Sequence, residues 1–142
     1  MRDTLLTAPE EVKMSDYGMS QVYNGSVVEA EAAITAALKE VGFGVLTRID
    51  VADTLKKKID YDRAPYVILG ACNPKVASEA LEMEEELGLL LPCNVIVYQN
   101  SKGETVVSVI EPETMLSVVN RDDMISLAAE IRVLLNRALN SI

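Results

Sequence analysis

Apolar residues along this chain recur with the period of a strand in some segments and with the period of a helix in others. Residues 44–50 alternate at every second position, which is typical of a half-buried β-strand. Residues 66–71 are apolar on both faces, which predicts a strand buried in the middle of a sheet. Residues 94–99 and 105–110 are apolar runs joined by a short loop containing Gly103, so they predict a β-hairpin.

The segments between these strands have the pattern of helices. Ser26 and Glu29 have the spacing of a capping box, and Gly42 ends the apolar repeat that follows them. The other predicted helices are a short one through residues 55–58, one from Pro74 to about Glu86 with Asn73 as its N-cap, and a C-terminal one capped by Asp122 or Asp123.

A further strand at residues 17–23 completes the predicted order, β-α-β-α-β-α-β-β-α. The final hairpin is antiparallel, and the helices are predicted to cover one face of the sheet in an α+β arrangement. No repeat, low-complexity tract or linker divides the chain, so we expect residues 16–142 to form a single domain. Residues 1–15 lie outside the pattern and are expected to form an N-terminal appendage.

Charge and hydropathy restrict the classes of partner. The 142 residues include 22 acidic and 13 basic ones, which gives a net charge of -9. Nucleic acids and anionic membranes favour clustered Lys and Arg, so we expect neither as a partner. No apolar run approaches the roughly 18 residues that a membrane span needs, and residues 1–14 lack the apolar core of a secretory signal. We therefore expect a cytoplasmic protein.

The chain lacks the residues on which many active sites depend. It contains no His, which excludes Ser–His and Cys–His nucleophile pairs and imidazole zinc sites. Residues 42–44, Gly-Phe-Gly, lack the remaining glycine of a phosphate-binding loop. Asp50, Asp53, Asp60 and Asp62 do not have the spacing of an EF-hand loop. The sequence therefore predicts no metal site and identifies neither a cofactor nor a catalytic constellation.

The two cysteines have mirror-image surroundings and form the candidate site. Cys72 follows a strand and precedes a helix start, which favours a thiolate, whereas Cys93 lies between a proline and the next strand. For both, the alternative is a small buried core residue. Asn73 and Asn94 are candidate ligand contacts through their amides, with helix capping and local backbone bonding as the alternatives. The thiols meet if the two strands are antiparallel neighbours and lie about 20 Å apart if they are parallel.

Four segments resemble the bacterial family catalogued as domain of unknown function 302. They are GFGVLT at 42–47, TLK at 54–56, LGACNP at 69–74 and LLLPCNV at 89–95. The resemblance extends over roughly residues 20–138 and implies a curved, mainly antiparallel sheet of about five strands with helices on one face, like that of the TATA-binding protein. That fold favours antiparallel neighbours for the two cysteine strands. It implies a fold and a candidate site, whereas DNA binding is not carried over with the fold.

The leading interpretation is a homodimeric module that binds an unidentified small ligand near Cys72 and Cys93. The apolar surplus of the last helix and of residues 89–91 suggests an interface between two copies. A thiol-based redox or metal-handling protein that uses the same cysteines is one alternative. A structural or protein-interaction domain is the other.

Overall fold

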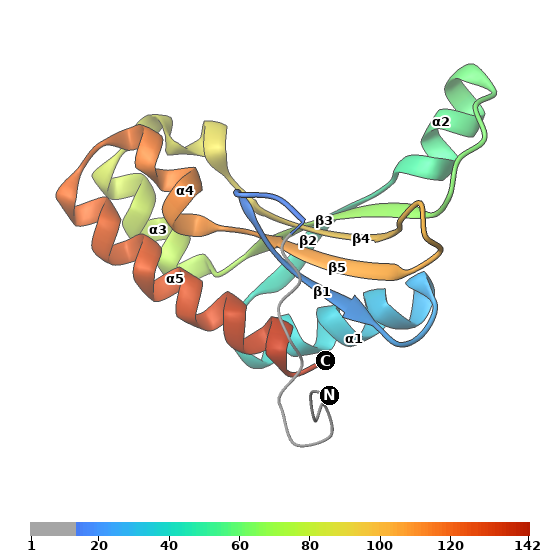
Figure 1. The fold of residues 1–142 in the computed structure, drawn as a ribbon. Helices are drawn as coiled ribbons and strands as arrows, with labels where there is room; N and C mark the ends of the chain where they lie inside the picture. Colours follow the sequence, from blue (N-terminus) through green and yellow to red (C-terminus); the bar gives the residue numbers. More distant parts are fainter. Residues whose placement is uncertain (1–13) are drawn as a thin grey trace.

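The computed structural model describes residues 14–142 and has the predicted α+β architecture (Figure 1). The predicted appendage at residues 1–15 lies outside the described residues except for its last two positions. The elements are β1 (Gly18–Tyr23), α1 (Val27–Glu40), β2 (Gly44–Asp50), α2 (Val51–Ile59), β3 (Tyr66–Cys72), α3 (Pro74–Met83), the 3-10 helix η2 (Glu85–Leu90), β4 (Cys93–Gln99), β5 (Thr105–Ile110), α4 (Pro112–Leu116), the 3-10 helix η3 (Ser117–Val119) and α5 (Asp122–Asn140).

The five strands form one open sheet in the order β1-β5-β4-β3-β2. Every neighbouring pair is antiparallel, which confirms the predicted sheet. β3 and β4 are neighbours, and Ala71 near the end of β3 pairs with Cys93 at the start of β4. The antiparallel alternative for the two cysteine strands is therefore the correct one. β2 forms one edge of the sheet, and its register shifts at a bulge between Val45 and Thr47.

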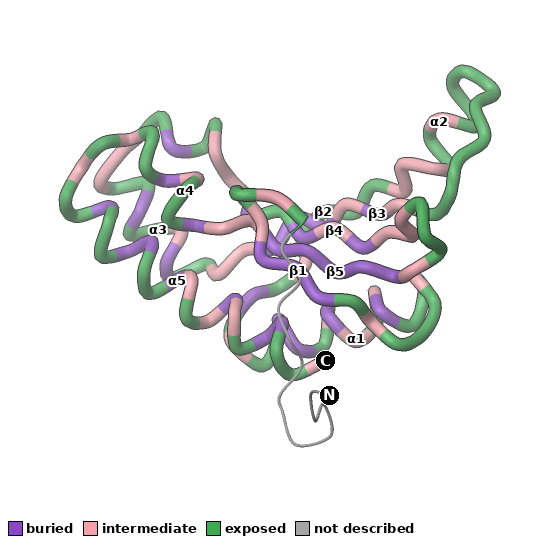
Figure 2. Tube along the Cα trace, viewed as in Figure 1, coloured by how far each residue is buried: buried purple, intermediate pink, exposed green. Residues whose placement is uncertain are grey.

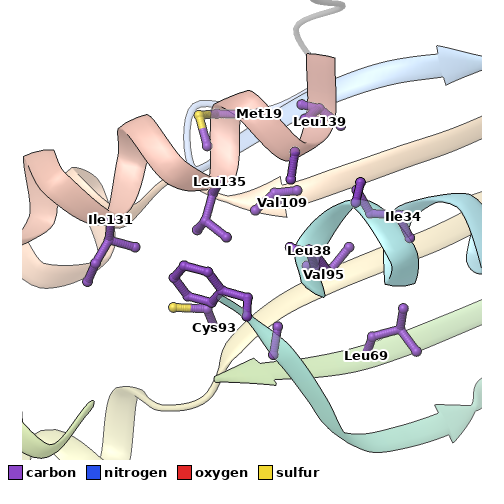
Figure 3. Close-up of a cluster of buried hydrophobic side chains, with 14 of the residues drawn as sticks. Met19, Ile34, Leu38, Leu69, Cys93, Val95, Val109, Ile131, Leu135 and Leu139 are labelled. Atoms are coloured by element: carbon purple, nitrogen blue, oxygen red, sulfur yellow. The ribbon is translucent and has the colours of Figure 1, made fainter. Parts of the chain in front are cut away.

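The hydrophobic core lies between one face of the sheet and the helices α1 and α5 (Figures 1 and 2). Side chains alternate along a strand, so every second residue of the central strands points to these helices. Leu69, Val95 and Val109 come from the sheet, and Leu38 and Leu135 come from the two helices (Figure 3). All five side chains are fully or almost fully buried, which places the core directly beside Cys93.

Two helix ends differ from the sequence predictions. α3 ends at Met83, earlier than predicted, because the acidic residues that follow oppose the dipole at a helix C-terminus. Neither predicted aspartate is the N-cap of α5: Arg121 occupies that position, and it pairs with Asp123 at 2.7 Å. Within the run at residues 89–91, Leu89 is 82% exposed, because Leu87 takes the buried position in η2.

Gly103 closes the β4–β5 hairpin with a φ of +80°. A β-branched residue resists this conformation, so we expect Gly103→Val to lower the free energy of unfolding by about 1 kcal/mol or more. A lower denaturant midpoint would register the loss. Gly44→Val is the matched control, because Gly44 has no positive φ and a Cβ there meets no atom within 4 Å. Equal midpoints for Gly103→Val and the unsubstituted chain would contradict the predicted turn.

Candidate functional site

A cavity of about 370 Å³ lies where β3 ends and β4 begins. Residues from β2, α3, η2, α4 and α5 complete its wall. Its lining is mostly aliphatic and, among the described residues, includes no charged side chain. The apolar wall includes Phe43, Val76, Ala77, Ala80, Leu87, Leu91, Met115, Leu116, Leu127 and Ile131.

Both cysteines line this cavity as free thiols. Cys93 is only 4% exposed, whereas Cys72, the last residue of β3, is half-buried. Burial, together with the nearby Cys72 thiol, raises the pKa of Cys93 to about 11. At neutral pH the buried sulfur is therefore a protonated thiol, which presents an apolar surface and a weak donor to the cavity.

Asn73 supplies the amide group of the cavity wall. Its side-chain Oδ1 accepts a hydrogen bond of 3.2 Å from the N–H of Val76, so Asn73 is the N-cap of α3 as predicted. The amide Nδ2 lies beside Gly42, where a Cβ would approach it to 3.1 Å. Because the capping bond uses only the oxygen of the amide, Nδ2 remains a donor at the cavity wall.

Asn94 does not belong to this cavity. It pairs with Gly70 in the sheet, and its side chain alternates with that of Cys93, so the two point to opposite faces. On the open face, Asn94 lines a different hollow with Tyr66 and Tyr98. The structure therefore brings Cys72, Asn73 and Cys93 together and separates Asn94 from them.

The other residues of the cavity wall were not predicted from the sequence as part of the site. Phe43 and Thr47 line it from the GFGVLT segment. This segment contributes to the family resemblance, but nothing in its sequence predicts a role in the site. Met115 of α4 and Ile131 of α5 reach it from far along the chain. Their spacing is that of ordinary core positions, so the sequence has no signal that separates cavity lining from core packing.

A second hollow, of about 600 Å³, lies between the start of α1 and the start of α2. Several of its polar groups already have hydrogen-bond partners. Ser26 accepts from the N–H of Glu29 at the start of α1, and Asp50 caps α2. Arg48 forms a two-bond ion pair with Glu31, with the shorter N···O distance at 2.5 Å. Because these groups already have partners, the smaller apolar cavity is the better candidate site.

Residues 14–142 contain no features that match a metal site or a membrane span. No three acidic, Cys or His side chains gather there in a way that would hold a metal ion. In the same part of the chain, no helix is both long enough and apolar enough to cross a membrane.

The open antiparallel sheet, the single helix-covered face and the apolar cavity define a small α+β protein. The chain belongs to the family described as "Domain of unknown function DUF302", whose sequence pattern matches residues 19–142. It is similar to the crystal structure of the uncharacterized conserved protein DUF302 from Bacillus stearothermophilus, with a TM-score of 0.83, 28% identity, and coverage of 89% of this chain and 98% of that one. No curated protein matches the chain. The predicted family and fold are thus confirmed.

Proposed function

We propose that this chain is a homodimeric small-ligand-binding module whose ligand occupies the cavity at Cys72 and Cys93. The observation that carries the proposal is a cavity of about 370 Å³ without a charged lining residue among those described. Ligand sites in proteins are mostly apolar hollows of about 300–1,000 Å³ with a few polar groups. This cavity is at the lower end of that range, so it suits a small molecule.

The lining also defines the chemical class of the ligand. An ion buried here would have no opposite charge beside it, and burying an unpaired ion is costly, so the ligand is uncharged. Its apolar part packs against the aliphatic wall. The amide Nδ2 of Asn73 donates to an oxygen of the ligand and fixes its orientation. The thiol of Cys72 lies at the same wall.

The thiol-based alternative relies on the same two residues. Cys72 and Cys93 line one cavity, which favours a joint role in redox or metal chemistry. However, the thiolate is the nucleophile and the metal ligand, and a pKa of about 11 keeps Cys93 protonated at neutral pH. Ligand binding therefore has the better support. Titration of free thiols with and without reductant, together with metal analysis of the purified protein, separates the two functions.

A series of straight-chain alcohols from butanol to decanol tests ligand binding. Each added CH2 buried in the cavity contributes about 0.8 kcal/mol, so the affinity is expected to rise about fourfold per carbon. The increase should stop when the chain fills the cavity. Isothermal titration calorimetry measures both the slope and the length at which it ends.

The variant Ala77→Leu tests whether the alcohols bind in this cavity. Ala77 is half-buried in the cavity wall, so the larger side chain takes up ligand volume, and the longest alcohols should bind less well. Ala32→Leu is the control, because Ala32 is exposed on α1 outside the cavity. Affinities without dependence on chain length, or unchanged by Ala77→Leu, would contradict binding here and favour a structural or protein-interaction domain.

A further inference from the structure

The strand positions on the second face of the sheet carry no charge. Helices α1 and α5 cover the other face (Figure 1), and the antiparallel register assigns alternate residues of each strand to this open one. Within the described strands, these positions include no Asp, Glu, Lys or Arg, although 25% of the whole chain is charged. The face presents Ile49, Tyr66, Ile68, Ile96 and Tyr98 across β2, β3 and β4.

The accessible part of this face lies over β2, β3 and β4. On the β1–β5 side, Ser20 and Ser108 bond to each other at 2.7 Å, and both are buried. Across β3 and β4, Tyr66 and Tyr98 stack with ring centroids 5.2 Å apart and remain half-buried. Ile49 on β2 is 49% exposed. An uncharged surface of aromatic and aliphatic side chains is typical of the centre of a protein interface.

Helix α2 stands beside this face and, within residues 14–142, contacts mainly β2 and β3, the two strands that it connects. None of its nine residues is buried, and it extends beyond the sheet on the side away from α1 and α5 (Figures 1 and 2). Ile59 at its end and Tyr61 after it are 67% and 54% exposed. Its ion pairs, such as Lys57–Asp53 at 2.9 Å, are exposed and therefore contribute little to the stability of the helix. So short a helix is marginal in water and gains stability mainly from packing.

We infer that the open face over β2–β4, together with α2, meets the same surface of a second copy of this chain in a two-fold dimer. The inference rests on the homodimer of the proposed function and names its interface. Two copies with a net charge of -9 each repel one another, so they approach best through a surface without charge. The guanidinium of Arg63 lies over the ring of Tyr66 at 4.8 Å, but the strand positions themselves offer a partner recognised by its charge no complementary group.

The area of the face explains why α2 takes part. Three strands spaced about 4.8 Å apart and about six residues long span roughly 14 Å by 20 Å. That is well below the roughly 800 Å² per partner of a standard stable interface. α2 and the exposed residues that follow it supply additional apolar surface. The resulting interface is modest, so we expect a dimer that dissociates on dilution.

Other exposed apolar residues are alternative candidates for the dimer interface. The sequence pointed to the last helix and to residues 89–91 as the interface. Leu89 is 82% exposed, and Val133 of α5 is 58% exposed, so either would be available to a partner. However, neither residue lies on an uncharged sheet face, and Arg132 beside Val133 forms an ion pair with Glu111 at 2.8 Å. Singly exposed apolar residues are common on monomers and need no partner.

Glutamate substitutions on the two surfaces discriminate between these interfaces. Ile49→Glu and Tyr98→Glu each introduce two charges across the two-fold axis, so the dissociation constant of the dimer should rise by more than about tenfold. Val133→Glu and Leu89→Glu are the matched controls and should leave it unchanged. Sedimentation equilibrium over a dilution series measures the constant. Circular dichroism and alcohol binding check that each variant keeps its fold and its cavity.

The outcomes separate the interface from the rest of the proposed function. If the control variants dissociate the dimer and the face variants do not, the inferred interface is wrong while the homodimer stands. If the unsubstituted chain is monomeric at micromolar concentration, both the interface and the homodimer are overturned, and the alcohol series still decides on the ligand. Dissociation by the face variants alone supports the inference.

Discussion

Cys72 is expected to react with iodoacetamide at least about a hundredfold faster than Cys93 at pH 7. The thiolate is the reactive form, and a thiol with a pKa of about 11 is ionised to only about one part in ten thousand at that pH. Cys93 is also 4% exposed, whereas Cys72 is half-buried at the end of β3. Access and ionisation therefore both slow the reaction of Cys93. Mass spectrometry after brief alkylation gives the order of labelling.

The same reaction in denaturant is the control, because unfolding exposes both thiols and should make their rates nearly equal. Cys72→Ser is also expected to disturb ligand binding more than folding, because its side chain lies in the cavity wall without being fully buried. Faster labelling of Cys93 would contradict the predicted order. If neither thiol reacts before the protein unfolds, both cysteines are packing residues.

Gly70→Ala is expected to lower the free energy of unfolding by about 3 kcal/mol, the upper end of the usual cost of overpacking. A Cβ at Gly70 would lie 2.2 Å from Oγ1 of Thr47 and 2.8 Å from Cγ of Pro92, far inside normal contact. Neither neighbour yields easily, since Thr47 is β-branched and Pro92 is a ring. Denaturant unfolding measures the loss, and Gly44→Ala on β2 is the control in open space.

A second variant tests the cause of that loss. Thr47→Ala removes Oγ1, the atom closest to the new methyl group, so Gly70→Ala should cost less in that background. Thr47 and Pro92 also line the cavity, so a shift of either changes the binding of long alcohols. Additive losses in the two single variants and the double variant would place the strain elsewhere.

The fold was predictable where single residues mark the end of an element. The capping box of Ser26 and Glu29 and the cap of Asn73 lie as predicted, because each rests on a contact within a few residues. The N-cap of α5 was not predictable in this way. Arg121 binds the backbone oxygen of Met83, far along the chain, so it responds to tertiary structure.

The site was predictable only as far as strand neighbours determine it. The antiparallel pairing of β3 and β4 brings Cys72, Asn73 and Cys93 to one cavity. Asn94 was grouped with them because it is adjacent in sequence, but adjacency in a strand means opposite faces. The contributions of α4 and α5 depend on how those helices lie against α3, which periodicity alone does not specify.

The bulge between Val45 and Thr47 also bears on how copies of this chain avoid aggregation. β2 is an edge strand, and a flat edge offers its backbone N–H and C=O groups to any other strand. The bulge interrupts the regular spacing of these groups, and Arg48 and Asp50 place charges next to it. The bulge and these charges therefore disfavour growth of the sheet into fibrils through its β2 edge. They do not prevent two neutral sheet faces from packing together.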